Sequence, residues 1–172
     1  MKKINNIFLK KKILIYGLGK SGISTYNFLK QKTEIYLFDD NLLNNFRFKK
    51  KSLSYSKILK SDFDFIIISP GIDFSKCKLS KYLKQNYSKV YTDLDVFYSF
   101  FGNDSVTITG TNGKSTTAKL LYDVLRDQKK DARLVGNIGN PILSEKKIIK
   151  KTFFVIEASS YQLEYSKIFK SK

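Results

Sequence analysis

The stretch VTITGTNGKSTTAKLL, residues 106–121, has the pattern of a short strand, a glycine-containing turn and a helix that begins near Lys114. Successive backbone N–H groups in such a turn, together with a helix N-terminus, form a concave electropositive cradle for phosphate. The ammonium group of Lys114 would lie against the β- and γ-phosphates, and the Ser115 hydroxyl would ligate Mg²⁺. The stretch therefore predicts a nucleotide site inside an α/β unit.

The glycine spacing identifies the type of phosphate loop. The general pattern has a glycine five residues before Gly113, and this chain has Ile108 there. The match is to the variant TGTNGKS, residues 109–115, which we interpret as an ATP site. A glycine turn that joins a strand to a helix by chance is the alternative. The predicted ATP-binding residues are Gly110, Thr111, Asn112, Gly113, Lys114, Ser115 and Thr116.

A second glycine turn lies near the N-terminus. Residues 13–16 form an apolar run of strand length, followed by GLGKSG at residues 17–22, a helical pattern, a second strand over residues 34–38, and Asp39. A strand, a GxGxxG turn, a helix, a strand and an acid about 20 residues on form the dinucleotide-binding fingerprint. A Rossmann-like scaffold that packs tightly without any ligand is the alternative.

The middle of the chain continues this α/β alternation. Residues 63–69 predict a buried strand that ends in Ser69-Pro70-Gly71, at the sheet edge where ligands bind in open α/β folds. A plain turn would also explain those three residues. We further expect a variable helix or loop without chemistry over 41–61, helices over 79–86 and 93–101, and a short strand over 89–91. Residues 102–104 then link a domain 1–102 to a domain 103–172.

The second half ends in an acid next to the predicted phosphate loop. After a helix over 116–128 and a strand over 133–135, the turn GNIGNP occupies residues 136–141. The apolar strand 153–156 then delivers Glu157, which is well placed to hold Mg²⁺ with Ser115. A surface glutamate is the alternative. Residues 158–164 are dense in hydroxyl and amide groups.

Composition narrows the class of protein. The 172 residues carry a net charge of +17, yet only three of the 32 basic residues are arginines, so the excess of lysine does not predict a nucleic-acid partner. With no histidine, imidazole chemistry is excluded, and the single Cys77 fits a reducing compartment. The N-terminus shows no clean signal peptide and no run is long enough to span a bilayer. We expect a cytoplasmic protein without a membrane partner.

The ordered motifs resemble those of the Mur ligases. The blocks are GLGKSG at 17–22, SPG at 69–71, TGTNGKST at 109–116, GNIGNP at 136–141 and EASSYQLE at 157–164, and together they cover most of the chain. The last block points, within this family, to the member that adds D-glutamate. The resemblance implies a Rossmann-like parallel-sheet domain followed by the first part of a P-loop ATPase-type α/β domain.

The resemblance also implies roles for individual residues. The N-terminal domain would bind a UDP-sugar instead of NAD, with Lys20 and Ser21 near the diphosphate and Asp39 near the uracil or its ribose. The UDP-sugar residues are Lys20, Ser21, Asp39, Ser69, Gly71, Asn137, Ser159 and Gln162. The implied catalytic residues are Lys114, Glu157 and Asn137, and the implied Mg²⁺ ligands are Ser115 and Glu157.

The implied reaction is ATP-dependent amide formation by a monomer. Its substrates would be ATP, D-glutamate and UDP-N-acetylmuramoyl-L-alanine, a peptidoglycan precursor, joined through an acyl phosphate. In this family a histidine, a modified lysine, the adenine contacts and the D-glutamate site lie beyond the segment that corresponds to residue 172. We therefore expect these residues alone to bind but not to complete the reaction. A binding-only module and a Rossmann NAD enzyme are the two alternatives.

Overall fold

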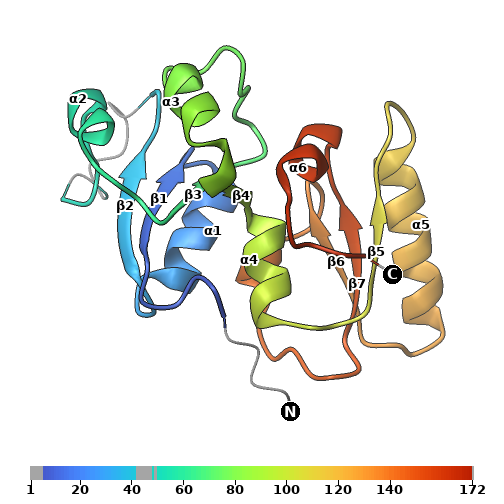
Figure 1. Cartoon of the computed structure of the whole chain (residues 1–172). Helices are drawn as coiled ribbons and strands as arrows, with labels where there is room; N and C mark the ends of the chain where they lie inside the picture. Colours follow the sequence, from blue (N-terminus) through green and yellow to red (C-terminus); the bar gives the residue numbers. More distant parts are fainter. Residues whose placement is uncertain (1–5, 42–47, 49, 172) are drawn as a thin grey trace.

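The computed structural model describes residues 6–41, 48 and 50–171, which form two parallel β-sheets joined side by side (Figure 1). We call residues 6–100 the first unit and residues 105–171 the second unit. Helix α4 lies between the two sheets, and α5 covers the outer side of the second sheet (Figure 1). The fold is α/β with parallel sheets, as predicted.

The first unit has a four-stranded sheet in the order β2-β1-β3-β4, all parallel. Its elements, in chain order, are β1 (Lys12–Tyr16), α1 (Lys20–Leu29), β2 (Glu34–Phe38), α2 (Tyr55–Leu59), β3 (Phe65–Ile68), α3 (Ser80–Gln85), η3 (Tyr87–Lys89), β4 (Val90–Thr92) and α4 (Asp93–Phe100).

The central strand β1 explains why this unit folds. Its residues 13–16 are fully buried, and alternate side chains enter different cores. Ile13 and Ile15 pack into the core that faces α1 and α4, whereas Leu14 and Tyr16 pack into the core beside α3. A strand buried on both faces must be apolar at every position, which is why this segment reads as a continuous apolar run.

The second unit has a three-stranded parallel sheet in the order β5-β7-β6. Its elements are β5 (Ser105–Ile108), α5 (Lys114–Asp127), β6 (Ala132–Gly136), η4 (Ile142–Ser144), β7 (Phe153–Glu157) and α6 (Ser160–Tyr165). Ala118 is the buried residue of α5, while Leu120 and Val124 on the same helix are 64% and 44% exposed. Two apolar side chains of α5 are therefore open to solvent.

One apolar core runs through both units. It contains Ile13 and Ile15 of the first sheet together with Phe154 and Ile156 of the second. The Phe97 and Phe154 rings meet edge to face with centroids 4.8 Å apart. Because parallel strands present their carboxyl ends at one edge of a sheet, both glycine turns and the turn at Ser69 open at carboxyl edges.

The element predictions are confirmed with small shifts at their ends. Strand β4 begins one residue later than predicted, because residues 87–89 form a 3₁₀ turn, and β3 spans only four of the seven residues predicted. Of the variable region 41–61, residues 42–47 and 49 lie outside the described residues; α2 occupies part of the remainder. The domain division at residue 102 stays a prediction.

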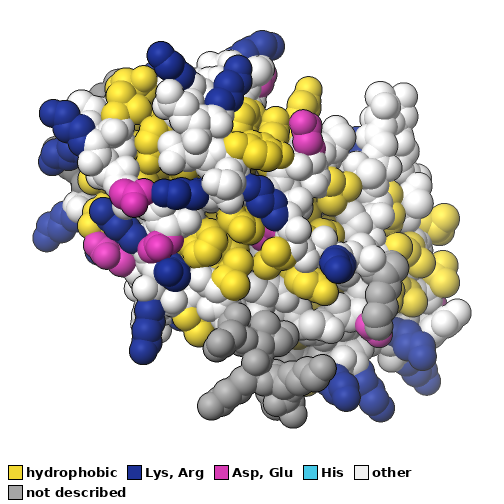
Figure 2. Space-filling model, in the orientation of Figure 1, with side chains coloured by type: hydrophobic (Ala, Val, Ile, Leu, Met, Phe, Trp, Pro, Cys, Tyr) yellow, Lys and Arg dark blue, Asp and Glu magenta, His cyan; other side chains and the backbone are white. Residues whose placement is uncertain are grey.

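The distribution of basic side chains and the lengths of the apolar helices bear on nucleic-acid and membrane partners, both of which the sequence predicts to be absent. On the face in Figure 2, lysine and arginine side chains are dispersed around the periphery and do not form one basic patch. Within the described ranges, no helix is both long enough and apolar enough to cross a bilayer. The absence of nucleic-acid and membrane partners stays a prediction.

Candidate functional site

The first glycine loop, residues 17–22, is packed against its surroundings. Gly17 has a φ of +94°, and a Cβ there would lie 2.9 Å from the Ser69 Cβ. A Cβ on Gly22 would lie 1.8 Å from the Gly17 carbonyl oxygen, so helix α1 starts directly against the loop. The Ser69 hydroxyl donates to the same carbonyl at 2.7 Å. The glycines are therefore required by close backbone packing.

Asp39 fixes the first glycine loop from the end of β2. One carboxylate oxygen accepts the Leu18 N–H at 2.6 Å, and the other accepts the Asn41 N–H at 2.8 Å. The acid that the fingerprint assigns to a ribose or base thus also holds the backbone of the loop. Its carboxylate still lines the adjoining pocket.

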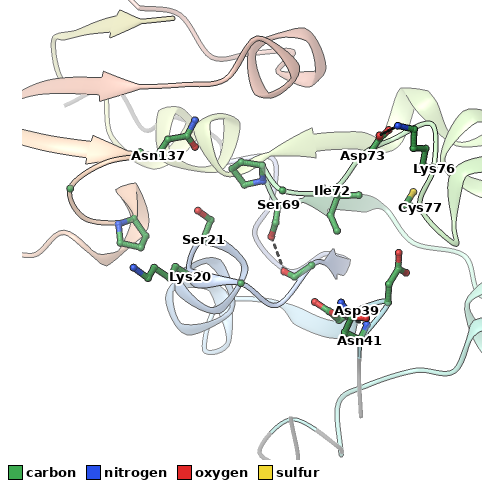
Figure 3. A pocket seen from close by; sticks show the side chains of 18 residues that line it. Lys20, Ser21, Asp39, Asn41, Ser69, Ile72, Asp73, Lys76, Cys77 and Asn137 are labelled. Carbon is green, nitrogen blue, oxygen red and sulfur yellow. Dashed lines mark hydrogen bonds and ion pairs between the residues drawn. The ribbon is translucent and has the colours of Figure 1, made fainter. Parts of the chain in front are cut away.

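A pocket of about 580 Å³ lies between the two units, and we call it the junction pocket (Figure 3). Six of the eight predicted UDP-sugar residues line it: Lys20, Ser21, Asp39, Ser69, Gly71 and Asn137. Figure 3 shows Ser21 and Asn137 reaching toward the same space from different units. Residues 136, 137, 139 and 141 close the pocket from the second unit.

The junction pocket also contains residues that the sequence motifs did not indicate. They are Asp40, Asn41, Ile72, Asp73, Lys76 and Cys77. The Tyr16 hydroxyl donates to Asp40 at 2.7 Å, and burial, with the Cys77 thiol and Asp40 beside it, raises the pKa of Tyr16. Burial likewise raises the pKa of the Cys77 thiol. Asp40 and Asn41 closely follow the end of β2, and Ile72 and Asp73 closely follow the end of β3. This position in the sequence could have indicated them as pocket residues.

The two other predicted UDP-sugar residues lie outside the lining of the junction pocket. Ser159 caps α6, its hydroxyl accepting the Gln162 N–H at 3.1 Å. Gln162 is 3% exposed, and its Nε2 donates to Asp93 Oδ1 at 2.6 Å. Within the described residues its Oε1 has no hydrogen-bond partner, and it borders a cavity of about 10 Å³ behind Ser69 and Pro70. Substrate contact by these residues stays a prediction.

The second glycine loop, residues 109–115, is open to solvent. Gly110 and Gly113 have φ values of +140° and +76°, and a Cβ on Gly113 would find nothing within 4 Å. The Lys114 ammonium folds back over the loop and donates to the carbonyls of Gly110, at 2.8 Å, and Thr111, at 3.2 Å. Because the N-cap residue of α5 is Gly113, the first N–H groups of this helix have no side-chain cap.

Glu157 connects the second glycine loop to the junction pocket. Its side chain, 4% exposed, accepts the Ser115 hydroxyl at 2.8 Å, and its backbone carbonyl accepts the Asn137 N–H at 2.9 Å. A hydroxyl and a carboxylate are the oxygen ligands that Mg²⁺ prefers. In the described part of the chain, no group of three or more acidic, cysteine or histidine residues is arranged to hold a metal ion, so a metal here would depend on this pair and on phosphate oxygens.

Similarity to known proteins indicates the class of protein to which this site belongs. Residues 108–171 match the Mur ligase middle domain. Nearly the whole chain is in addition similar to part of named ligases, and these two similarities together indicate a Mur ligase portion.

The relatives have one name in common, UDP-N-acetylmuramoylalanine--D-glutamate ligase. The protein from Rickettsia bellii is 36% identical over an alignment of 172 positions that covers 96% of this chain and 38% of that protein. The one from Caldicellulosiruptor bescii is 34% identical over 94% of this chain, and the one from Buchnera aphidicola 36% identical over 96%. The chain thus spans 38–39% of the length of these relatives.

Proposed function

We propose that this chain is the substrate-binding and phosphate-binding part of an ATP-dependent ligase of peptidoglycan-precursor synthesis. The junction pocket takes UDP-N-acetylmuramoyl-L-alanine, the second glycine loop takes the phosphates of ATP, and D-glutamate is the amino acid added. The match to the Mur ligase middle domain and the names of the relatives support this proposal. We also propose the domain boundary at residue 102, a monomer, and a cytoplasmic location.

The observation that carries the proposal is the position of Glu157. Its backbone carbonyl holds Asn137 at the rim of the junction pocket, while its carboxylate holds Ser115 of the second glycine loop. A sugar substrate that extends past Asn137 would therefore bring its far end toward the phosphates. Bringing the two reactants together in this way is worth many orders of magnitude in rate.

The second glycine loop fits a nucleotide triphosphate and Mg²⁺. Its two glycines leave open space over the backbone, and the uncapped N–H groups of α5 point toward that space. Lys114 would exchange its two backbone carbonyl partners for phosphate oxygens and neutralise charge there. Ser115 and Glu157 would hold Mg²⁺, which supplies charge neutralisation at the transferred phosphate.

The proposed reaction forms an amide in two steps. The alanyl carboxylate of the UDP-sugar attacks the γ-phosphorus of ATP, giving an acyl phosphate and ADP. The amine of D-glutamate then attacks the acyl carbon, and inorganic phosphate leaves. In the first step the protein positions the reactants and neutralises charge, so this chain needs no nucleophilic side chain.

Calorimetric titration of the chain with UDP-N-acetylmuramoyl-L-alanine and, separately, with NADH tests the binding part. We expect the UDP-sugar to bind. We expect Lys20→Ala to weaken that binding about tenfold, because one charge-assisted contact to the diphosphate is lost. Lys30→Ala, just beyond α1 and outside the pocket lining, is the matched control. Tight NADH binding without UDP-sugar binding would overturn the proposal in favour of a Rossmann NAD enzyme.

A turnover assay separates the ligase from a binding-only module. ATP, Mg²⁺, D-glutamate and the UDP-sugar are incubated with the chain, and the dipeptide product and ADP are quantified. Product formation that depends on D-glutamate would assign the complete reaction to these residues. Binding of both substrates without product would assign them the binding role alone.

A further inference from the structure

The side chain of Asp95, in the first turn of α4, is fully buried and accepts hydrogen bonds from both units. Within the first unit, Thr92 donates to Oδ2 through its backbone N–H at 2.9 Å and its hydroxyl at 3.3 Å. The bond from the Thr92 N–H is one half of the capping box of α4, whose other half is the Asp95 N–H donating to the Thr92 side chain, and it explains the acid in the first turn.

The other carboxylate oxygen belongs to the second unit. Three consecutive backbone N–H groups, of Lys167, Ile168 and Phe169, donate to Asp95 Oδ1 at 2.8, 2.8 and 3.0 Å. Their donors lie 72–74 residues further along the chain, in the segment after α6. One buried carboxylate thus joins the start of α4 to the end of the second unit through charge-assisted hydrogen bonds.

Neighbouring contacts also join the two units, among them a hydrogen bond from Lys167 Nζ to the Tyr87 carbonyl and the stacked rings of Phe74 and Tyr165. The Thr92 and Ser166 hydroxyls lie 2.7 Å apart, and Gln162 donates once to Asp93. On the opposite side of α4, the junction is apolar, with Ile142 and Leu143 of η4 buried in the common core. Apolar packing permits small sliding, whereas hydrogen bonds to one fixed carboxylate set a position.

The junction pocket depends on that position, because it is lined from both units. Asn137 reaches it from the second unit, while Lys20 and Ser69 belong to the first. The second glycine loop, in contrast, lies wholly within the second unit. A change in how the units sit would therefore alter the junction pocket and leave the second glycine loop unchanged.

We infer that Asp95 is a positioning residue: it fixes the second unit on the first and so sets the shape of the junction pocket without contacting it. The identity of the pocket's ligand rests on the proposed function, whereas the position of the two units does not. The experiment is therefore read first without ligand and then with it.

Amide hydrogen exchange of the free chain is compared between wild type, Asp95→Asn and Asp93→Asn. An asparagine at 95 has one acceptor oxygen and cannot serve both units, so the amides of residues 167–169 should exchange at least about tenfold faster. At position 93 an asparagine oxygen can still accept from Gln162, so this matched control should stay within about twofold. Unchanged exchange of 167–169 in Asp95→Asn would overturn the inference.

The same variants are then titrated with UDP-N-acetylmuramoyl-L-alanine and with Mg–ATP. Asp95→Asn should weaken UDP-sugar binding about tenfold and change Mg–ATP binding by less than about twofold. Equal loss at both sites would indicate general unfolding and contradict a positioning role. If wild type does not bind the UDP-sugar, the proposed function fails, and the exchange rates still decide the inference.

A disulfide between the two units, in place of the hydrogen bonds of Asp95, gives a second test in case Asp95→Asn does not fold stably. Thr92→Cys with Ser166→Cys, in a Cys77→Ser background, places two thiols where the hydroxyls are 2.7 Å apart. Added to Asp95→Asn, the oxidised pair should restore UDP-sugar affinity to within about threefold of the Cys77→Ser protein, the reference because Cys77 lines the pocket, and reduction should remove it again. Failure of the oxidised form to restore binding would contradict the inference.

Discussion

The two glycine loops share a local plan, a parallel strand, a turn and a helix, yet they are held in different ways. The first glycine loop is fixed by distant residues: Asp39 accepts the Leu18 N–H, and Ser69 donates to the Gly17 carbonyl. The second contacts itself, with Lys114 bonded to the carbonyls of its own turn. One loop is therefore formed before any ligand arrives, and the other has exchangeable partners.

The difference follows from what surrounds each helix. The first turn of helix α1 places Gly22 against the backbone of Gly17, and the helix packs on η4, whereas α5 buries only Ala118. A pre-formed wall favours recognition of a rigid ligand, because little ordering entropy is lost on binding. An open loop that folds back on itself suits a triphosphate that enters and leaves in every cycle.

The largest expected effect comes from adding one methyl group to each loop. In Gly22→Ala, the new Cβ would lie 1.8 Å from the Gly17 carbonyl oxygen, so we expect a loss of about 3 kcal/mol or more in unfolding free energy. In Gly113→Ala, only the left-handed backbone is strained, at about 1–2 kcal/mol. Urea denaturation measures both. Equal losses would contradict the contrast between the loops.

Asp93, a buried acid at the carboxyl edge of the first sheet, predicts that the unfolding free energy depends on pH. We expect this change to be no larger than the loss caused by Gly22→Ala. Burial raises the pKa of Asp93 to about 6, against which the hydrogen bond from Gln162 acts; Asp95 lies nearby. Because the folded-state pKa is above the unfolded one, this contribution is fully present below about pH 4 and is lost as the pH rises through about 6.

The test is the difference in unfolding free energy between wild type and Asp93→Asn across that range. We expect it to change by up to about 3 kcal/mol between pH 4 and 7, with wild type losing relative stability as the pH rises. Both proteins contain the other acids, such as Asp64, whose pKa is lowered by the hydrogen bond from the Lys12 N–H. Their contributions to the pH dependence therefore cancel in the difference. A flat difference would show that Asp93 is ionised normally.

The next effect separates binding from stability. Lys114→Ala removes an ammonium whose present partners are exposed carbonyls, so we expect unchanged folding and UDP-sugar binding. Mg–ATP affinity should fall by about 1.5–3 kcal/mol, or tenfold to a hundredfold. Lys119→Ala, which removes a surface partner of Asp123 on the same helix, serves as the control. Parental ATP affinity in Lys114→Ala would refute the second glycine loop as the phosphate site.

The smallest effect concerns the connection between Ser69 and the first glycine loop. Ser69→Ala removes the hydroxyl that donates to the Gly17 carbonyl at 2.7 Å, and it should cost about 1 kcal/mol in unfolding free energy. The control is Ser61→Ala, whose hydroxyl makes only a local bond to Lys57. A Ser69→Ala protein as stable as the control would show that Ser69 does not hold the first glycine loop in place before a ligand binds.

The strands and both glycine turns could be predicted from the sequence, because each depends on a local pattern. The proximity of Ser115 and Glu157 could also be predicted, because each follows a parallel strand. Runs such as residues 13–16 and 153–156 identify strands buried on both faces, and parallel strands bring their carboxyl ends together. Six of the eight predicted UDP-sugar residues consequently line one pocket.

The remaining features depend on packing between distant segments. The three donors to Asp95 come from residues 167–169, which show no motif, and Gln162 turns toward Asp93 instead of the junction pocket. No local periodicity encodes these contacts, since each depends on how the two units meet.

Amide hydrogen exchange with and without each ligand tests the central claim most directly. In the free chain, we expect the amides of Gly17, Leu18 and Ile23, which donate to fixed acceptors, to be protected, and those of residues 110–115 to exchange quickly. Mg–ATP should slow residues 110–115 alone, and UDP-N-acetylmuramoyl-L-alanine should slow residues 69, 71, 72 and 137 around an already protected first loop. Equal exchange in both loops of the free chain, or protection of the first loop by Mg–ATP, would contradict the account.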